Sequence, residues 1–173
     1  MLIFLHMYLF TVEQDNRTAV ILRSSFGFCA AAGKNIVRYG HTAYPIRKNS
    51  RVLQLIKTVS GNCDMMSMEP PWRKIEVAGL RIFMTHGHLY DVKYGLERIA
   101  ARAYADGADI VLFGHTHNPI SKYLPEGTEL EFVGKTERPL LLFNPGTAGM
   151  GFDHTFGRLT FSGGEVFPSH GKI

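Results

Sequence analysis

The feature that most constrains the fold is a repeated pattern, in which a short apolar run ends in a loop rich in His, Asn, Gly or Asp. Short apolar runs bounded by polar turns are typical of buried strands. Helical spacing over residues 90–106, with Gly107 as a C-terminal stop, predicts a helix between the second and third runs. The chain is therefore expected to be an α/β protein. The four apolar runs are residues 52–59, 80–84, 109–113 and 140–143.

Further strands are expected on both sides of these runs. In the helix, Tyr94, Ile99 and Ala103 are expected to face inward. The sequence Ser162-Gly163-Gly164 is a good hairpin turn. The additional strands are predicted at residues 2–10, 19–22 and 130–133, the last pairing with 140–143, and at residues 156–161 and 165–167, which flank the hairpin turn.

We found no linker or internal repeat that would justify a domain boundary. Residues 1–173 are therefore predicted to form a single domain, of which residues 1–50 are less orderly and atypical.

The four loops that follow the apolar runs contain the residues that are candidates for metal binding and catalysis. Ligands gather at the strand ends on one edge of an α/β sheet, so the loops are expected to converge. In a tight loop, two histidines at positions i and i+2 can present nitrogens to two adjacent metals. Neutral imidazole suits Mn, Fe, Zn or Ni, and two such ions about 3.5–4 Å apart form a clamp for phosphoryl transfer. The loops read Gly61-Asn62-Cys63-Asp64, Thr85-His86-Gly87-His88, Gly114-His115-Thr116-His117 and Asn144-Pro145-Gly146.

In this order, the four motifs resemble those of the calcineurin-like metallophosphoesterases, especially the small YfcE-type phosphodiesterases. The resemblance covers about residues 52–173. It implies a metallophosphoesterase-like two-sheet sandwich flanked by helices. It also implies a divalent-metal-dependent phosphodiesterase that hydrolyses a phosphoester by metal-activated water.

The resemblance also assigns roles to individual residues. It implies that Asn62, His86 and His115 bind one metal and that His117 binds the other. His88 is expected either to support the metal ligands from behind or to face the substrate, and His88 and Asn62 are the candidate catalytic residues. The expected cofactor is Mn²⁺, with Zn²⁺, Ni²⁺ and Mg²⁺ as alternatives. Asn144-Pro145-Gly146 could serve as a structural turn or position the substrate, and both interpretations stay open.

Two acidic motifs of the family are missing from residues 1–60. The family pattern opens with Asp-x-His and then Gly-Asp, whereas this chain has Gly40-His41 and only Asp15 before Asp64. Two dications repel each other by several kcal/mol even at an effective dielectric of ~20, and a neutral ligand in place of a bridging carboxylate leaves that repulsion nearly unrelieved. We therefore expect one metal rather than two to bind tightly. A reading-frame slip, a mis-called start and true divergence are the three hypotheses for residues 1–50.

Charge and composition limit the classes of partner that the chain is expected to bind and the location in which it is expected. Residues 1–60 hold eight Lys/Arg against two acidic residues, about +6, but the basic residues are scattered, so no nucleic-acid partner is predicted. No apolar run reaches the ~18 residues of a membrane span. Two cysteines cannot build a disulfide framework, and a cytoplasmic location is expected. The expected partner is a small-molecule phosphoester, and a homo-oligomer is left open.

Two other functions compete with hydrolysis. The chain could be a binding or scaffold module with an impaired metal centre, like the retromer subunit that resembles this fold. The missing acidic motifs favour this hypothesis. His86, His115 and His117 favour hydrolysis, because all three metal-ligand positions of the second half are intact. A single-metal binding or storage protein is the third hypothesis.

Overall fold

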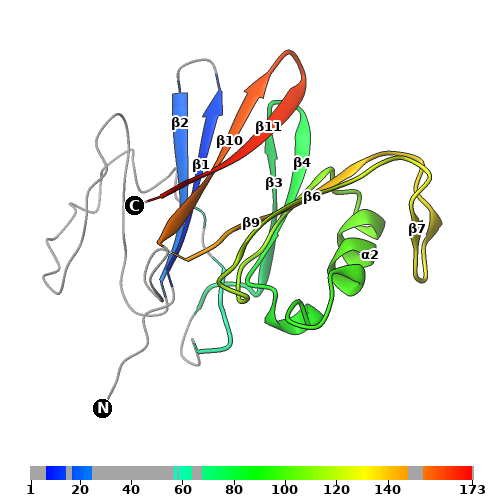
Figure 1. Ribbon diagram of the computed structural model, residues 1–173, viewed down its shortest axis with the longest axis horizontal. Coiled ribbons are helices and arrows are strands. Elements are labelled where there is room, and N and C mark those ends of the chain that lie inside the picture. The colour runs from blue at the N-terminus through cyan, green and yellow to red at the C-terminus, as the bar shows by residue number, and fades with distance from the viewer. Residues whose placement is uncertain are drawn as a thin grey trace, which may run out of the picture.

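The computed structural model describes residues 7–14, 17–24, 57, 59–63, 68–147 and 154–172, with the first two segments described as backbone. These residues form two larger β-sheets and one small one (Figure 1). The helix α2 (Glu97–Ala105) and the hairpin of β7 (Glu129–Leu130) and β8 (Gly134–Lys135) lie beside the five-stranded sheet. The four-stranded sheet has the order β11-β10-β1-β2, with bounds Glu165–Lys172, Thr155–Ser162, Met7–Gln14 and Arg17–Ser24. The five-stranded sheet has the order β3-β4-β5-β9-β6, with bounds Trp72–Val77, Leu80–Thr85, Ile110–Leu112, Leu140–Pro145 and Pro119–Leu124.

Strands β4, β5 and β9 run parallel at the centre of the five-stranded sheet, with antiparallel β3 and β6 at its edges. The three central strands are apolar along nearly their whole length because both faces of the sheet are covered. One face packs against β10 in a core that includes Ile82, Leu112, Phe143 and Leu159, all at most 1% exposed. The sheet therefore lies in the middle of the molecule.

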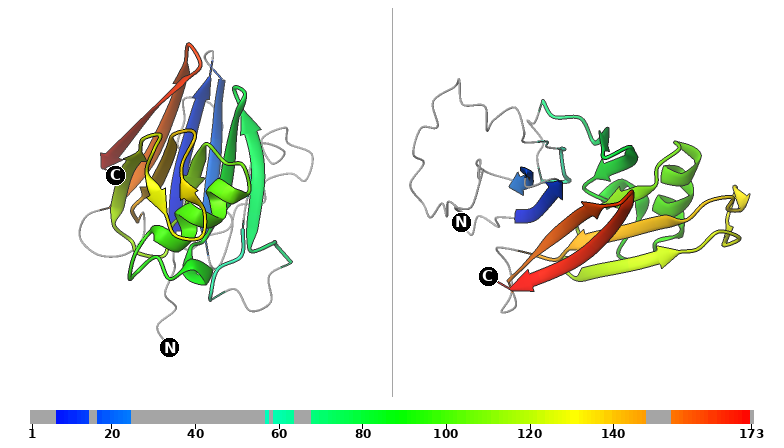
Figure 2. Two further views of the ribbon diagram at one scale, coloured as in Figure 1. Left: turned by 90° about the vertical axis from the view of Figure 1, so that its right-hand side faces the viewer. Right: turned by 90° about the horizontal axis from the view of Figure 1, so that it is seen from above.

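The other face of the five-stranded sheet is covered by α2 (Glu97–Ala105). Ile99 and Ala103 of this helix are fully buried against Phe83 and Val111. Figure 2 (left) shows α2 and the hairpin of β7 (Glu129–Leu130) and β8 (Gly134–Lys135) in front of the strands. The expected fold class, an α/β sandwich of two sheets, is confirmed.

The helix is shorter than predicted at its N-terminal end. A 3-10 turn, η1 (His88–Tyr90), is followed by turns up to Leu96, the N-cap of α2. Tyr94 is 92% exposed, so its predicted inward position is wrong. Gly95 explains the late start, because glycine is a poor helix former. At the other end, Gly107 has φ +82° and donates to Tyr104 O, as predicted for the stop.

The strand predictions have mixed outcomes. The strands predicted at residues 80–84 and 109–113 and in the C-terminal hairpin are confirmed. Strands β3 and β6 were not predicted from the sequence. The predicted pairing of 130–133 with 140–143 is wrong, because β9 pairs with β5 and β6 while Leu130 pairs with Gly134. Residues 2–6 and most of the predicted strand 52–59 lie outside the described residues. Residues 19–22 fall inside β2.

Among the described residues, no helix combines the length and apolar character needed to cross a membrane.

Candidate metal and phosphoester site

The candidate site lies at the edge of the sheet where parallel strands β4, β5 and β9 end. The motifs with His86 and His115 follow β4 and β5, whereas Asn144-Pro145-Gly146 forms the end of β9. The backbone joins the first two of these segments directly. Gly114 N donates a hydrogen bond of 3.1 Å to His86 O. The expectation that loops distant in sequence converge is met for these three strands.

Three imidazole rings gather at this edge, and we call His86, His88 and His115 the histidine cluster. The ring centroid of His86 lies 5.0 Å from that of His88 and 4.9 Å from that of His115. The centroids of His88 and His115 lie 6.2 Å apart. His86 is only 2% exposed, whereas His88 and His115 are half-buried. The two half-buried rings are therefore the more accessible members of the cluster.

The Nδ1 atoms of His86 and His88 lie 3.0 Å apart. At this distance one ring can donate an N–H to the lone pair of the other, in a direction set by the tautomers of the two rings. Two nitrogens held at a right angle around one ion, each about 2.1 Å from it, are also about 3.0 Å apart. The same separation thus suits either a shared proton or two adjacent ligand positions.

The donor atoms of the cluster are of the kind that a divalent ion prefers, but too few of them are arranged around one point. Neutral imidazole nitrogens are good ligands for Mn²⁺, Ni²⁺ and Zn²⁺. Within the segments that the structure describes, however, no three His, Cys, Asp or Glu side chains are arranged around one point as a metal ion would need.

The loop after β5 has an unusual backbone conformation. His115 has φ +70° and His117 has φ +63°, both in the left-handed region that non-glycine residues seldom adopt. Thr116 N donates to Gly114 O at 2.9 Å, which closes the turn tightly. His117 follows in this turn and is half-buried. The sequence predicted both histidines as ligands, but it did not predict the left-handed backbone.

Asn144 lies beside this turn and is fully buried at the end of β9. Its Nδ2 donates to Gly114 O at 3.1 Å and to Thr116 Oγ1 at 3.0 Å. Its Oδ1 accepts a hydrogen bond of 3.0 Å from Gly146 N. The sequence left the role of Asn144 open and gave none to Thr116. Neither role could be found locally, because the partners are 28 and 30 residues apart.

Asn62 is placed differently from the histidines. It is exposed, and its Nδ2 donates to the sulfur of neighbouring Cys63 at 3.4 Å. Asp64 lies outside the described residues. Of the predicted site residues, the ring contacts thus bring together His86, His88 and His115, and the predicted role of Asn62 as a ligand stays a prediction.

Tyr90 closes the 3-10 turn that begins at His88. Its ring packs edge-on against Phe83 with centroids 6.0 Å apart. Burial raises the pKa of the Tyr90 hydroxyl; the Arg102 charge lowers this pKa by a smaller amount, and the Asp106 charge raises it further. Tyr90 is therefore a packing support for this loop.

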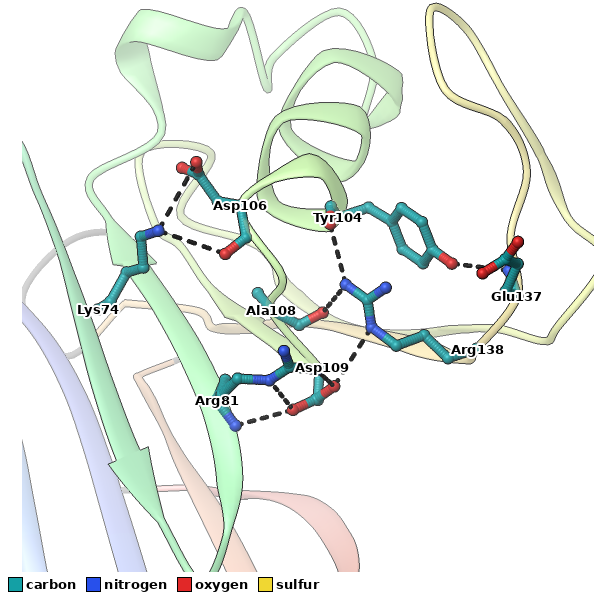
Figure 3. A network of polar contacts seen from close by, with 8 residues as sticks. All are labelled: Lys74, Arg81, Tyr104, Asp106, Ala108, Asp109, Glu137 and Arg138. Atoms are coloured by element: carbon teal, nitrogen blue, oxygen red, sulfur yellow. Dashed lines mark hydrogen bonds and ion pairs between the residues drawn. The ribbon is translucent and has the colours of Figure 1, made fainter.

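The charged side chains around Asp109 gather at the opposite edge of the sheet. Arg81, at the start of β4, binds Asp109 through two side-chain hydrogen bonds of 3.0 and 2.9 Å (Figure 3). Arg138 Nε lies 3.4 Å from the same carboxylate. Arg81 lies at the start of β4, and Asp109 and Arg138 precede β5 and β9. The network therefore holds the strands together at the ends away from the candidate site.

Comparisons with known proteins bear on the family to which the chain belongs. The family described as "Calcineurin-like phosphoesterase superfamily domain" matches residues 28–163. A Bacillus subtilis protein named "Probable metallophosphoesterase YsnB" is 32% identical over 95 residues, which are 55% of this chain and 48% of that protein. The Escherichia coli (strain K12) phosphodiesterase YfcE is 27% identical over 109 residues, covering 58% of this chain and 48% of that protein. The chain thus matches about half the length of these relatives.

Among solved structures, an uncharacterized Streptococcus pneumoniae protein described as a predicted phosphoesterase superposes with a TM-score of 0.52 at 23% identity. The match covers 74% of this chain and 76% of that one. This likeness supports the fold. Together with the family match, which spans most of the sequence, it leads to one conclusion. The chain belongs to the calcineurin-like phosphoesterase superfamily.

Proposed function

We propose that this protein is a divalent-metal-dependent phosphodiesterase that hydrolyses a small-molecule phosphoester in the cytoplasm. The observation that carries the proposal is the histidine cluster at the ends of β4 and β5, where His86 and His115 lie with ring centroids 4.9 Å apart. Membership of the phosphoesterase superfamily supports the same chemistry. Mn²⁺ is the proposed ion.

The proposed ligands are His86, His115, His117 and Asn62, and one ion rather than two is expected to bind tightly. A divalent ion, when bound, supplies a Lewis acid for a phosphoryl oxygen and lowers the pKa of coordinated water. The chain itself supplies imidazole N–H groups next to the ligands. His88 is half-buried and 3.0 Å from buried His86, so it is the ring that we propose to face substrate and stabilise developing negative charge.

The first prediction concerns His115. Purified protein supplied with Mn²⁺ should hydrolyse a chromogenic phosphodiester such as bis-p-nitrophenyl phosphate. His115→Ala should lower kcat/KM by about 10²-fold or more, because removing a ligand disrupts the ion that activates water. The control is Tyr123→Ala, a 64% exposed residue on edge strand β6 opposite Leu141, which should keep wild-type activity.

Two outcomes would contradict the proposal. One is the absence of turnover with Mn²⁺, Zn²⁺, Ni²⁺ and Mg²⁺ in turn, in protein shown by circular dichroism to be folded. The other is turnover that His115→Ala leaves unchanged.

A binding module with an impaired metal centre is the second candidate, favoured by the sequence of residues 1–60. That segment lacks the Asp-x-His and Gly-Asp motifs and has Asp15 as its one aspartate. Metal binding without turnover of any phosphodiester would favour this candidate, whereas turnover that depends on His115 favours hydrolysis.

A further inference from the structure

The turn after β5 is held in a conformation that its own residues disfavour. His115 and His117 both have positive φ, which costs free energy in a non-glycine residue unless the surrounding structure compensates. Two strained residues in one four-residue motif therefore need an external support.

Asn144 and Thr116 provide that support, and we call the pair the amide clamp. The Asn144 amide donates to Gly114 O and Thr116 Oγ1, the two groups on either side of His115. Thr116 Oγ1 also accepts a hydrogen bond of 3.3 Å from Asn118 N, on the far side of His117. Each strained histidine is thus flanked by groups that the clamp fixes.

The clamp is anchored on the sheet rather than on a loop. Asn144 is fully buried at the end of β9. Its Oδ1 accepts from Gly146 N, and its main-chain oxygen accepts a 2.7 Å hydrogen bond from His170 Nε2 on β11. All the polar atoms of the Asn144 side chain are therefore engaged in one fixed orientation.

We propose that Asn144 and Thr116 are positioning residues, whose clamp holds the left-handed turn that carries His115 and His117. The assignment to metal binding rests on the proposed function above, since it takes these two histidines as ligands. Neither clamp residue touches the ion or the substrate. They act by fixing in advance the backbone from which the two imidazoles project.

Thr116 offers a matched pair of substitutions. Thr116→Val keeps the shape of the side chain but removes the hydroxyl, whereas Thr116→Ser keeps the hydroxyl. In metal-free protein, Thr116→Val should shift the backbone ¹³Cα and ¹³Cβ resonances of His115 and His117 away from left-handed values. Titrated with Mn²⁺, the same variant should bind about 10–100-fold more weakly than wild type. Thr116→Ser should keep the wild-type values in both measurements.

Two further variants separate positioning from general stability. Asn144→Asp keeps the oxygen that accepts from Gly146 N but loses both clamp donors, so it should reproduce the effects of Thr116→Val. His170→Ala removes a contact to the Asn144 main chain and leaves the clamp intact. It should therefore leave the His115 and His117 resonances unchanged, whatever its effect on the unfolding midpoint.

The inference is overturned if Thr116→Val keeps both the wild-type histidine resonances and the wild-type Mn²⁺ affinity. It is also overturned if Thr116→Ser loses them to the same extent as Thr116→Val. Should wild-type protein bind no Mn²⁺, the proposed function fails, while the resonances of the metal-free Thr116 pair still decide whether the clamp holds the turn. Should Asn144→Asp fail to fold, the Thr116 pair alone gives the answer.

Discussion

Gly146 marks the point where the loop after β9 has the least room. Its φ is +84°, and a Cβ built on it would lie 1.9 Å from Thr155 Oγ1. That hydroxyl cannot move aside without loss, because it donates to Pro145 O at 2.8 Å and accepts from Thr147 N at 3.2 Å. Glycine is thus needed here both for its backbone conformation and for its size.

We predict that Gly146→Ala destabilises the fold by about 2–4 kcal/mol, from left-handed strain and displacement of Thr155 together. Gly79→Ala is the matched control, since Gly79 has φ +78° but nothing within 4 Å of its Cβ position. The control should lose only about 1–2 kcal/mol. Urea unfolding of both variants makes the comparison, and equal losses would show that Thr155 leaves room after all.

The residues of the site differ in how far sequence could predict them. His86, His88 and His115 were predictable because each follows a recognisable apolar strand. Thr116 and Asn144 were not assigned, because a hydrogen bond between residues 28 positions apart leaves no local pattern. The left-handed φ of His115 and His117 was not predicted either, because histidine adopts positive φ only occasionally and no local pattern marks those occasions.

Among the elements, β4, β5 and the segment before β9 are tied together by Asp109. Arg81 donates to this carboxylate through its main-chain N as well as its guanidinium, and Arg138 adds a second positive charge. Burial alone would raise the pKa of Asp109. Hydrogen bonds from Arg81 and the charges of Arg81 and Arg138 outweigh burial and hold the pKa below its ordinary value of 3.8.

A depressed carboxyl pKa stabilises the folded state at every pH above the unfolded value of 3.8, and this contribution is lost as pH falls through the lower folded value. Asp109→Asn should therefore lower the free energy of unfolding at pH 7 by about 1–3 kcal/mol. The difference between wild type and variant should shrink below pH 4. Urea unfolding between pH 7 and pH 2.5 measures it, and a difference that stays constant over that range would contradict the account.

Local pattern predicted the elements better than their pairing. Residues 130–133 and 140–143 are close in sequence, which suggests a hairpin, yet all six residues of β9 are buried and such a strand belongs at the centre of a sheet. The edge strand β6 has three of its six residues exposed in a row, so it lacks the strict alternation that reveals a strand.

At the scale of the whole molecule, the two larger sheets share one core. Leu159 of β10 is fully buried against Phe143 and Leu112 of the five-stranded sheet. The sheets approach closely there, since a Cβ on Gly157 would lie 2.5 Å from Phe143 Cε1. This packing joins the C-terminal hairpin to the strands that carry the histidine cluster.

Leu159→Ala should therefore lower the free energy of unfolding by about 2–5 kcal/mol. Exposed Arg158 precedes it on the same strand, and Arg158→Ala should stay within about 0.5 kcal/mol of wild type. Denaturant unfolding followed by both far-UV and near-UV circular dichroism should give one transition. A Leu159→Ala loss below 1 kcal/mol would show that the two sheets do not depend on this core.

The most direct test of the site is the number of Mn²⁺ ions bound per chain in wild type, His86→Ala and His115→Ala, measured by equilibrium dialysis and elemental analysis. We expect one tightly bound equivalent in wild type and a loss of tight binding in both variants. Failure of wild type to bind any Mn²⁺, or binding that neither substitution weakens, would contradict a metal centre at the ends of β4 and β5.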